Sequence, residues 1–330
     1  MAQIVLGVGS SHGPTIQTPP ERWFMLGEKD REDPRYDFGA ELDAASPEIE
    51  NELAPQKMQE RYDACQEGIR VVSGVMADAA IDAIIVISNP HGVPPANRMD
   101  PVFGIYLSGT ESQVGRSGHQ PSRRRGPATD AAPSVERSVE PYATMPPLAD
   151  HLMEHLVLDG FDLASCFQSD PTAGIEGPFT FPYDRFLPDR ETPVVPFLLS
   201  RYLPHQATPA RCYALGQSIR TAVDRWDADA RVAIFASGGL SHQIIDEELD
   251  RAVIKALEDQ DVDALCALDR ARLNRAPGTP ETLNWLTVAG ALEELPMTLV
   301  DYVPCYRSMA GTGHGVTFGY WQNEPPKKGA

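Results

Sequence analysis

The chain has 330 residues, of which 42% are hydrophobic and 23% are charged, and its formal net charge at pH 7 is −19. This composition is that of a globular protein with a sizeable core, and the negative charge argues against nucleic acid or an anionic membrane as the main partner. No apolar run approaches the roughly 18 residues of a membrane span. The five cysteines lack CxxC spacing and no signal peptide is recognisable, which together predict a cytoplasmic protein.

Short apolar runs rich in β-branched residues alternate along the chain with longer stretches of helical periodicity. The apolar runs predict buried strands at residues 3–8, 83–88, 103–107, 192–199 and 232–237. The periodic stretches predict helices at residues 55–79, 146–160, 211–226, 246–259 and, with a break at NRAPGTP, 260–300. This alternation predicts an α/β fold in which helices flank a central parallel or mixed sheet.

Two segments lack such periodicity and are expected to be long loops. Residues 18–39 are rich in proline and charge, and residues 108–141 form the longest polar stretch of the chain. Long loops in a compact domain often carry function, although surface disorder is the alternative for the second segment. We therefore expect one domain over residues 1–330, with 18–39 and 108–141 as loop insertions.

Three of the eight histidines share one context, directly after an apolar run and beside small residues or proline. His12 follows QIVLGVGSS, His91 follows AIIVISNP and His242 follows VAIFASGGLS. A single histidine at a strand end is mostly an ordinary turn residue. Because ligands of open α/β sheets gather at the carboxyl ends of strands, three such histidines favour one shared site.

Imidazole is a good ligand for iron, zinc and copper, and two imidazoles with one carboxylate are typical of a non-haem ferrous site. Spacing alone does not identify the carboxylate. Glu281 is one candidate, because it follows Pro280 and would lie in the first turn of a helix, where its charge is favoured. An ordinary glutamate at a helix start is the alternative interpretation.

Several blocks, in the same order, resemble the LigB-type extradiol dioxygenases, the class III ring-cleavage enzymes typified by the protocatechuate 4,5-dioxygenase β subunit. SSH at 10–12 resembles the TSH strand end of that family, and SNPH at 88–91 resembles its NDH context. The similarity continues with PPLADHLMEHLVLDGFD at 146–162, SGGLSHQ at 237–243 and ETLNWLTVAGAL at 281–292. The resemblance implies a LigB-like sandwich with long loops over the active site.

The resemblance also implies roles for individual residues. It implies that His12, His91 and Glu281 hold Fe(II), which is the expected cofactor. It further implies that His242 is a catalytic acid–base histidine rather than a metal ligand, and that His151 is another active-site histidine.

The implied reaction is extradiol cleavage, with Fe(II) and O2, of a carboxylated catechol-type aromatic from lignin breakdown. Hydroxylated dicarboxybiphenyl, 3-O-methylgallate, gallate and protocatechuate are the expected substrates, and the expected assembly is a homo-oligomer, a dimer. Arg98, Arg185, Arg201 and the cluster 123–125 are candidates to bind the substrate carboxylate. The alternatives are a zinc-dependent relative that acts on catecholamines such as DOPA, a metal-binding member without activity, and a non-catalytic partner subunit.

Overall fold

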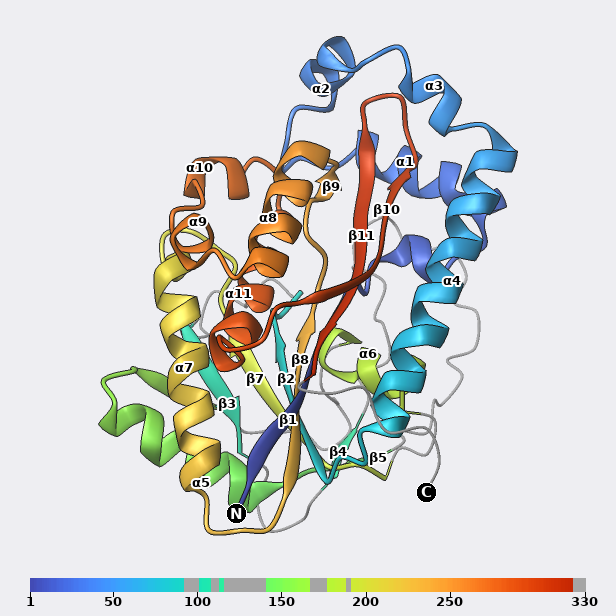
Figure 1. Cartoon of the computed structure of the whole chain (residues 1–330). Helices are drawn as coiled ribbons and strands as arrows, with labels where there is room; N and C mark the ends of the chain where they lie inside the picture. The colour runs from blue at the N-terminus through green and yellow to red at the C-terminus, as the bar shows by residue number, and fades with distance from the viewer. Residues whose placement is uncertain (92–100, 108–112, 116–140, 167–176, 188–190, 323–330) are drawn as a thin grey trace, which may run out of the picture.

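The computed structural model describes residues 1–91, 101–107, 113–115, 141–166, 177–187 and 191–322. Most of the predicted loop 108–141 therefore lies outside the described residues. Helices cover both faces of one twisted central sheet, as Figure 1 shows. This arrangement confirms the predicted α/β fold with a mixed sheet between helical layers.

The central sheet has nine strands in the order β10-β11-β1-β8-β2-β7-β3-β6, and β9 pairs with β11. Strands β1, β8, β2 and β7 run parallel, whereas β11 and β3 lie antiparallel on either side of them. The bounds of these strands are β1 Gln3–Ser10, β2 Ala83–Ser88, β3 Phe103–Tyr106, β6 Leu163–Cys166, β7 Val194–Leu199, β8 Arg231–Ser237, β9 His242–Ile244, β10 Thr298–Tyr306 and β11 Thr312–Trp321. A separate pair joins β4 (Gln113–Gly115) and β5 (Pro141–Ala143).

The sheet is buried on both faces because alternate side chains of its strands enter two different cores. In β2, Ile85 and Ile87 belong to the core that contains helices α5, α7 and α11, and Ile84 and Val86 belong to the core that contains α4 and α6. The helices are α1 Trp23–Arg31, α2 Phe38–Ala44, α3 Ile49–Glu52, α4 Pro55–Asp78, α5 Pro146–Leu158, α6 Gly177–Arg185, α7 Pro209–Arg225, α8 Glu247–Asp259, α9 Val262–Cys266, α10 Arg270–Leu273 and α11 Thr282–Ala291. Short 3-10 turns are η1 Pro14–Ile16, η2 Pro20–Arg22 and η3 Thr279–Glu281.

Helix α11 is fully buried and packs directly on the backbone of α7. A Cβ atom on Gly216 would lie 2.0 Å from the carbonyl oxygen of Thr287, and one on Gly290 would lie 2.0 Å from the carbonyl oxygen of Tyr213. Both distances are below any real carbon–oxygen contact, so the two helices can approach this closely only with glycine at both positions. The contact fixes α11, and with it Glu281 at its N-terminal end.

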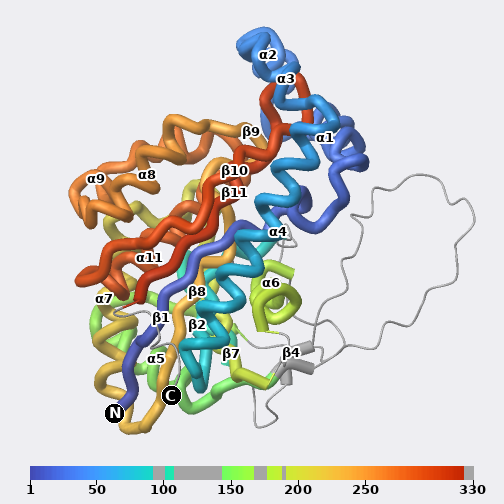
Figure 2. Tube along the Cα trace, turned by 45° about the vertical axis from the view of Figure 1, so that its right-hand side comes forward, coloured from blue at the N-terminus to red at the C-terminus, as the bar shows by residue number. Residues whose placement is uncertain are grey.

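The five predicted strands and the first four predicted helices are all present, with ends that differ by two residues at most. The prediction of a loop at residues 18–39 was wrong, because the segment contains η2, α1 and the start of α2. Its helix α1 forms because Trp23 is fully buried and donates its indole N–H to the carbonyl oxygens of Thr15 and Thr18. Figure 2 shows α1 beside the hairpin of β10 and β11, although the hairpin lies near the C-terminal end of the sequence.

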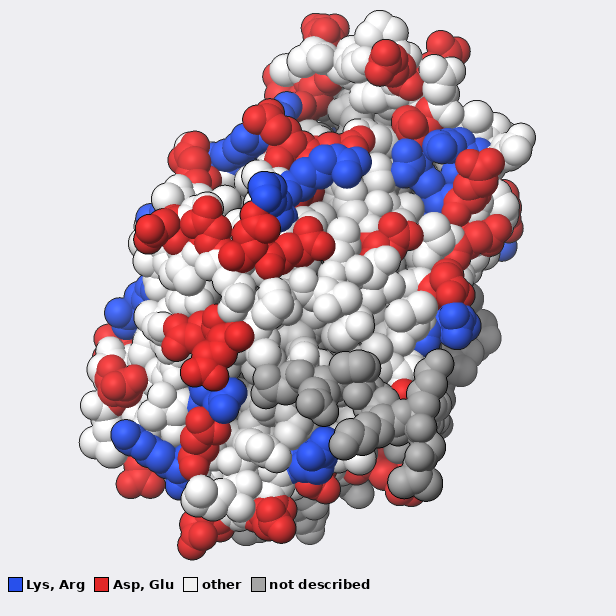
Figure 3. Space-filling model, viewed as in Figure 1, with Lys and Arg blue, Asp and Glu red and all other residues white. Residues whose placement is uncertain are grey.

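Charge on the surface follows the composition. On the face drawn in Figure 3, acidic side chains are spread widely, with basic side chains in smaller groups among them. Within the described ranges, no helix has both the length and the apolar character needed to cross a membrane.

Candidate metal centre

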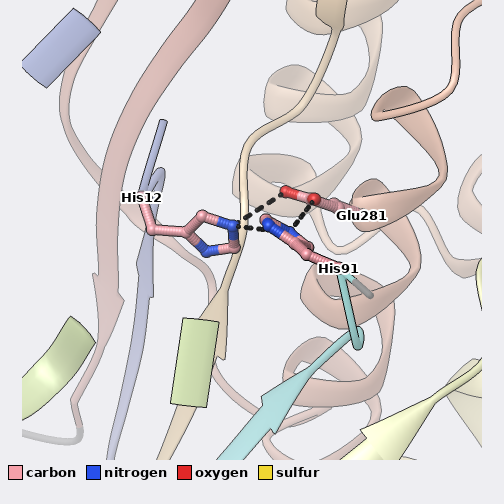
Figure 4. Close-up of side chains that lie close together, drawn as sticks. All are labelled: His12, His91 and Glu281. Carbon is pink, nitrogen blue, oxygen red and sulfur yellow. Dashed lines mark hydrogen bonds and ion pairs between the residues drawn. The ribbon is translucent and has the colours of Figure 1, made fainter. Parts of the chain in front are cut away.

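Parallel strands bring two of the predicted histidines to one edge of the sheet. His12 lies just beyond the end of β1 and His91 just beyond the end of β2, while Glu281 closes η3 at the start of α11. Their side chains point toward one another in Figure 4. His91 Nε2 lies 3.1 Å from His12 Nε2 and 3.0 Å from Glu281 Oε1, and His12 Nε2 lies 3.6 Å from Glu281 Oε2.

These separations fit three ligands of one ion. Ligand atoms that lie about 2.1 Å from a metal are about 3.0 Å apart when their bonds meet at right angles, and about 3.4 Å apart in a tetrahedron. The ligand atoms of His12, His91 and Glu281 all lie within 4.8 Å of one another. The cluster can therefore hold a divalent ion, and its dimensions suit iron and zinc alike.

The surroundings of His12 leave Nε2 ready to bind a metal. Ser237 donates its hydroxyl to the carbonyl oxygen of Pro178 at 2.6 Å, so its oxygen is left to accept from His12 Nδ1 at 3.1 Å. Nδ1 then carries the proton and Nε2 presents its lone pair to the cluster. Burial lowers the pKa of His12 to about 3 against the opposing attraction of Glu281, so the imidazole is neutral at pH 7.

Glu281 is completely buried and remains ionised. Burial by itself would raise its pKa, but the imidazoles of His12, His242 and His91 hold the pKa well below its ordinary value. Its carboxylate also accepts from Arg201 Nη1 at 3.1 Å and from the Gly239 backbone N–H at 3.2 Å. The cluster thus combines two imidazoles with one carboxylate, the set expected from the sequence.

His242 lies beside this cluster, at the first position of β9. Its Nδ1 is 3.4 Å from Glu281 Oε2, and its Nε2 is 2.7 Å from Nε2 of His314. The backbone N–H of His242 donates to the hydroxyl of Thr279, which begins the 3-10 turn that Glu281 ends. The structure therefore brings His242 to the carboxylate of the cluster.

His314 and Arg307 are buried site residues that the sequence interpretation missed. His314 lies within β11, and its Nδ1 is 3.1 Å from Thr15 Oγ1 and 3.2 Å from Arg307 Nη1. Arg307 makes a bidentate pair with Asp30 of α1. One signal in the sequence was available, because GTGHGV places a histidine between glycines in an otherwise apolar strand.

His151 is not brought to the cluster. It lies on α5, and its Nε2 bonds to the carbonyl oxygen of Ala222, near the end of α7. That end of α7 precedes the start of β8, whereas the cluster lies beyond the ends of β1, β8 and β2. The structure therefore places His151 toward the opposite edge of the sheet from the active-site position that the resemblance implies.

The candidate arginines are distributed differently. Arg201 reaches Glu281, whereas Arg185 donates to the side chain of Gln66 at 2.7 Å. Arg98 and the cluster 123–125 lie outside the described residues. A further arginine, Arg35, comes from the segment after α1 and was not among the candidates.

A cavity of about 200 Å³ opens beside the cluster. The cavity is lined mainly by polar atoms, and two of its lining residues are arginines. It is lined by Arg35, His91, Arg201, His242, Gln243 and Gly278. Gln243 has a left-handed backbone conformation with φ of 76°, and its side-chain amide donates to Asp33, which also pairs with Arg35.

Comparisons with known proteins agree with these features. A family model described as the catalytic LigB subunit of aromatic ring-opening dioxygenase matches residues 46–317, which include His91 and Glu281 but begin after His12. A gallate dioxygenase from Pseudomonas putida is 31% identical over 168 residues, 47% of this chain and 48% of that protein. The chain thus spans about half the length of this curated relative.

Several solved structures also match. One of them is the crystal structure of an uncharacterized protein from Escherichia coli K12, with a TM-score of 0.43 and 12% identity, over 96% of this chain and 99% of that one. A likeness at this level is too weak to inform fold or function.

Proposed function

Since this chain belongs to the family of catalytic LigB subunits of aromatic ring-opening dioxygenases, we propose that it is an extradiol dioxygenase that uses Fe(II) and O2. The observation that carries the proposal is the cluster of His12, His91 and Glu281 at the edge of the sheet. Two imidazoles and one carboxylate are the ligand set of non-haem ferrous oxygenases, and they would leave a bound ion with positions for substrate and dioxygen.

The chain's own residues have distinct parts in this proposal. His12, His91 and Glu281 hold the ion, and Ser237 fixes the ring of His12 with Nε2 toward it. Arg201 keeps the carboxylate of Glu281 in place from the side of the cavity. When bound, ferrous iron supplies the Lewis acidity that ionises a catechol hydroxyl and the electrons that activate dioxygen.

His242 is proposed as the acid–base residue. It is 9% exposed, lines the cavity and lies 3.4 Å from Glu281, so its ring is within reach of a catechol hydroxyl beside the cluster. A positioned imidazole can take the proton of that hydroxyl and later return it to the opening ring. His151 is left out of the proposed mechanism because its ring bonds to the backbone of α7.

We propose a carboxylated catechol or pyrogallol as the substrate. Arg35 and Arg201 give the cavity two guanidinium groups, which suit the carboxylate of an aromatic acid. The likeness to a gallate dioxygenase supports this class. Gallate, 3-O-methylgallate, protocatechuate and the larger hydroxylated dicarboxybiphenyl, all expected from lignin breakdown, are the compounds to compare.

The test is oxygen uptake by the anaerobically purified protein after loading with Fe(II) or, separately, Zn(II). We expect uptake with Fe(II) and one of the carboxylated diols, and a ring-opened product that contains both atoms of the consumed dioxygen. Activity with Zn(II) and DOPA would favour the zinc-dependent alternative. Metal binding without any uptake across the panel would favour the non-catalytic one.

The chain is proposed to act as one catalytic domain. Strand β1, at the start of the chain, pairs with β11, which ends at Trp321, so one sheet joins residues far apart in sequence. Cytoplasmic location and a homodimer are part of the same proposal. Gel filtration with light scattering tests the dimer directly.

A further inference from the structure

We propose that Asp30, Arg307 and His314 are positioning residues that fix which ring nitrogen of His242 carries its proton. The three residues form a buried chain that runs from helix α1 through the β10–β11 hairpin to His242. The inference rests on the acid–base part proposed for His242, and it assigns a task to residues that neither hold the ion nor line the cavity.

The first link of the chain is an ion pair with fixed geometry. Arg307 Nε lies 2.5 Å from Asp30 Oδ2, and Nη2 lies 2.7 Å from Asp30 Oδ1. Arg307 is 6% exposed and Asp30 is 5% exposed, so the two groups meet away from solvent. A bidentate pair of this kind sets the plane of the guanidinium and therefore the direction of its remaining N–H groups.

The second link determines the tautomer of His314. A guanidinium has five N–H donors and accepts no hydrogen bond, so Arg307 Nη1 must donate to His314 Nδ1, 3.2 Å away. Burial, together with the neighbouring His242 and Arg307, lowers the pKa of His314 well below its ordinary value, so the ring is neutral. A neutral imidazole that accepts at Nδ1 carries its proton at Nε2.

The third link determines the tautomer of His242. His314 Nε2 lies 2.7 Å from His242 Nε2, so the proton of His314 makes His242 Nε2 an acceptor. His242 must then carry its proton at Nδ1, which lies 3.4 Å from Glu281 Oε2. Among the described residues Nδ1 makes no hydrogen bond, so the donor at His314 fixes this tautomer, and the nearby carboxylate of Glu281 favours the protonated nitrogen on its side electrostatically.

Close backbone approach keeps both rings in place. A Cβ atom on Gly13 would lie 2.5 Å from His314 Cδ2, and one on Gly278 would lie 2.4 Å from His242 Cγ. A third glycine, Gly27 of α1, comes so close to Arg307 that a Cβ there would lie 2.3 Å from its carbonyl oxygen. Asp30, Gly13 and Gly27 come from the N-terminal segment that precedes the family match, whereas Arg307 and His314 come from the β10–β11 hairpin, so the two parts of the molecule build the chain together.

The arrangement has a consequence for the acid–base step. In this tautomer the proton of His242 lies at Nδ1, on the side of Glu281, and Nε2 is held by His314. Without the donor at His314, the two tautomers of a neutral imidazole would be free to exchange, and part of the population would carry its proton at Nε2 instead of Nδ1. Hydrogen-bond partners of metal-ligating histidines contribute about 10–100-fold, and we expect a contribution of the same order here.

The primary test reads the tautomer itself in the metal-free protein. Two-bond proton–nitrogen correlation spectra of protein labelled with nitrogen-15 at histidine report which ring nitrogen is protonated. At one fixed pH, we expect His242 of the wild type to be protonated at Nδ1, and His242 of Arg307→Met to populate both tautomers. Arg272→Met is the matched control, because Arg272 makes a similar bidentate pair with Asp246, at 2.7 and 2.6 Å.

A second pair of variants keeps the test decisive if Arg307→Met fails to fold. His314→Phe removes the donor to His242, whereas the amide of His314→Gln can still supply one. We expect mixed tautomers only in the first. Wild-type protein with His242 protonated at Nε2, or a single unchanged tautomer in both Arg307→Met and His314→Phe, would overturn the inference.

Kinetics of the iron-loaded protein give an independent readout. Arg307→Met should lower kcat by about 10–100-fold while iron content and KM change less than about twofold, and Arg307→Lys, which can still donate, should recover part of the loss. Equal loss in the Arg272→Met control would assign the effect to general destabilisation and overturn the inference. The spectra do not depend on turnover, so a protein without oxygenase activity would refute the proposed function and leave the tautomer result standing.

Discussion

In the part of the chain that the structure describes, the carboxylates of Glu281 and Asp250 are both completely buried, but their surroundings differ. Glu281 has three imidazoles, a guanidinium and a backbone N–H around it, and its pKa lies well below the ordinary value. Asp250 of α8 accepts from the backbone N–H and hydroxyl of Ser241 and from the hydroxyl of Tyr302. Burial raises the pKa of Asp250 to about 7, because these bonds to neutral groups offset only part of the penalty.

The difference shows that burial alone does not mark a functional carboxylate. Removal from water favours the neutral acid in both places, and nearby imidazoles or cations decide whether the charge survives. Glu281 keeps its charge and can attract a metal ion. Asp250 is poised to be protonated near neutral pH and ties β10 to the turn that precedes His242.

The largest expected effect separates the two carboxylates directly. Glu281→Gln preserves size but removes the charge, so Fe(II) affinity should fall by at least about 100-fold and oxygen uptake should disappear. Asp250→Asn, the matched change in the other cluster, should leave Fe(II) affinity within about twofold. Titration of the metal-free proteins with Fe(II) under anaerobic conditions measures both.

The same titration extends to the imidazoles. His12→Ala and His91→Ala should each weaken Fe(II) binding as severely as Glu281→Gln, since two remaining ligands hold the ion poorly. His155→Ala, on the half-buried side of α5, is the control. A ligand variant that retains full iron occupancy would remove that residue from the proposed centre.

The next prediction distinguishes a metal ligand from an acid–base residue at His242. His242→Gln should keep its iron and its catechol affinity but lose about 10²–10⁴-fold in kcat, the usual contribution of an acid–base group. Iron content by chelator assay and turnover by oxygen electrode are measured on one preparation. Parallel loss of iron and activity would make His242 a ligand and place it in the same class as Glu281.

Asp250 should affect the pH dependence of the free energy of unfolding and not the activity. Its pKa rises from 3.8 to about 7 on folding, so the folded protein holds one proton more than the unfolded chain between these values. The free energy of unfolding should therefore fall as pH rises through this window, by up to about 1.4 kcal/mol per pH unit from this group.

Asp250→Asn removes that contribution, because the amide resembles the protonated acid. Urea unfolding of the metal-free wild type and variant at pH 5, 6 and 7 measures the difference in slope. A difference that does not change with pH would mean that Asp250 is ionised throughout, as Glu281 is.

The smallest effect concerns a histidine outside both clusters. His151→Ala removes one hydrogen bond to the backbone of α7, which is worth about 1 kcal/mol of stability. Iron content and kcat should stay within about twofold of the wild type. A loss of turnover comparable to that of His242→Gln would show that His151 reaches the substrate in a conformation that differs from this one.

Local pattern was sufficient for much of the fold and for part of the site. Residues 83–88 and 232–237 are continuous apolar runs with β-branched residues, so the two strands could be predicted. The position of the histidines that follow them, at the ends of strands, could be predicted as well. The convergence of His12 and His91 follows from the parallel direction of β1 and β2. Glu281 could be named as a candidate, but its selection required knowledge of where α11 begins.

What the pattern missed depends on contacts between distant residues. Strand β11 is rich in glycine, which weakens a strand signal, and it is stabilised by pairing with β10, β1 and β9. Helix α1 has little apolar periodicity and forms where Trp23 and Gly27 meet the rest of the fold. His314 lies within a strand rather than at its end, so the rule that found three histidines passed over it.

The glycine contact between α7 and α11 places a constraint on how this protein can diversify. Gly216 and Gly290 allow the close contact because they have no side chain. Any other amino acid at either position would place a Cβ atom between the two helices and push them apart. Since α11 carries Glu281 at its first turn, such a change would displace a candidate ligand without altering it. The evolutionary freedom of the metal centre is therefore limited by two positions that no inspection of its ligands would identify.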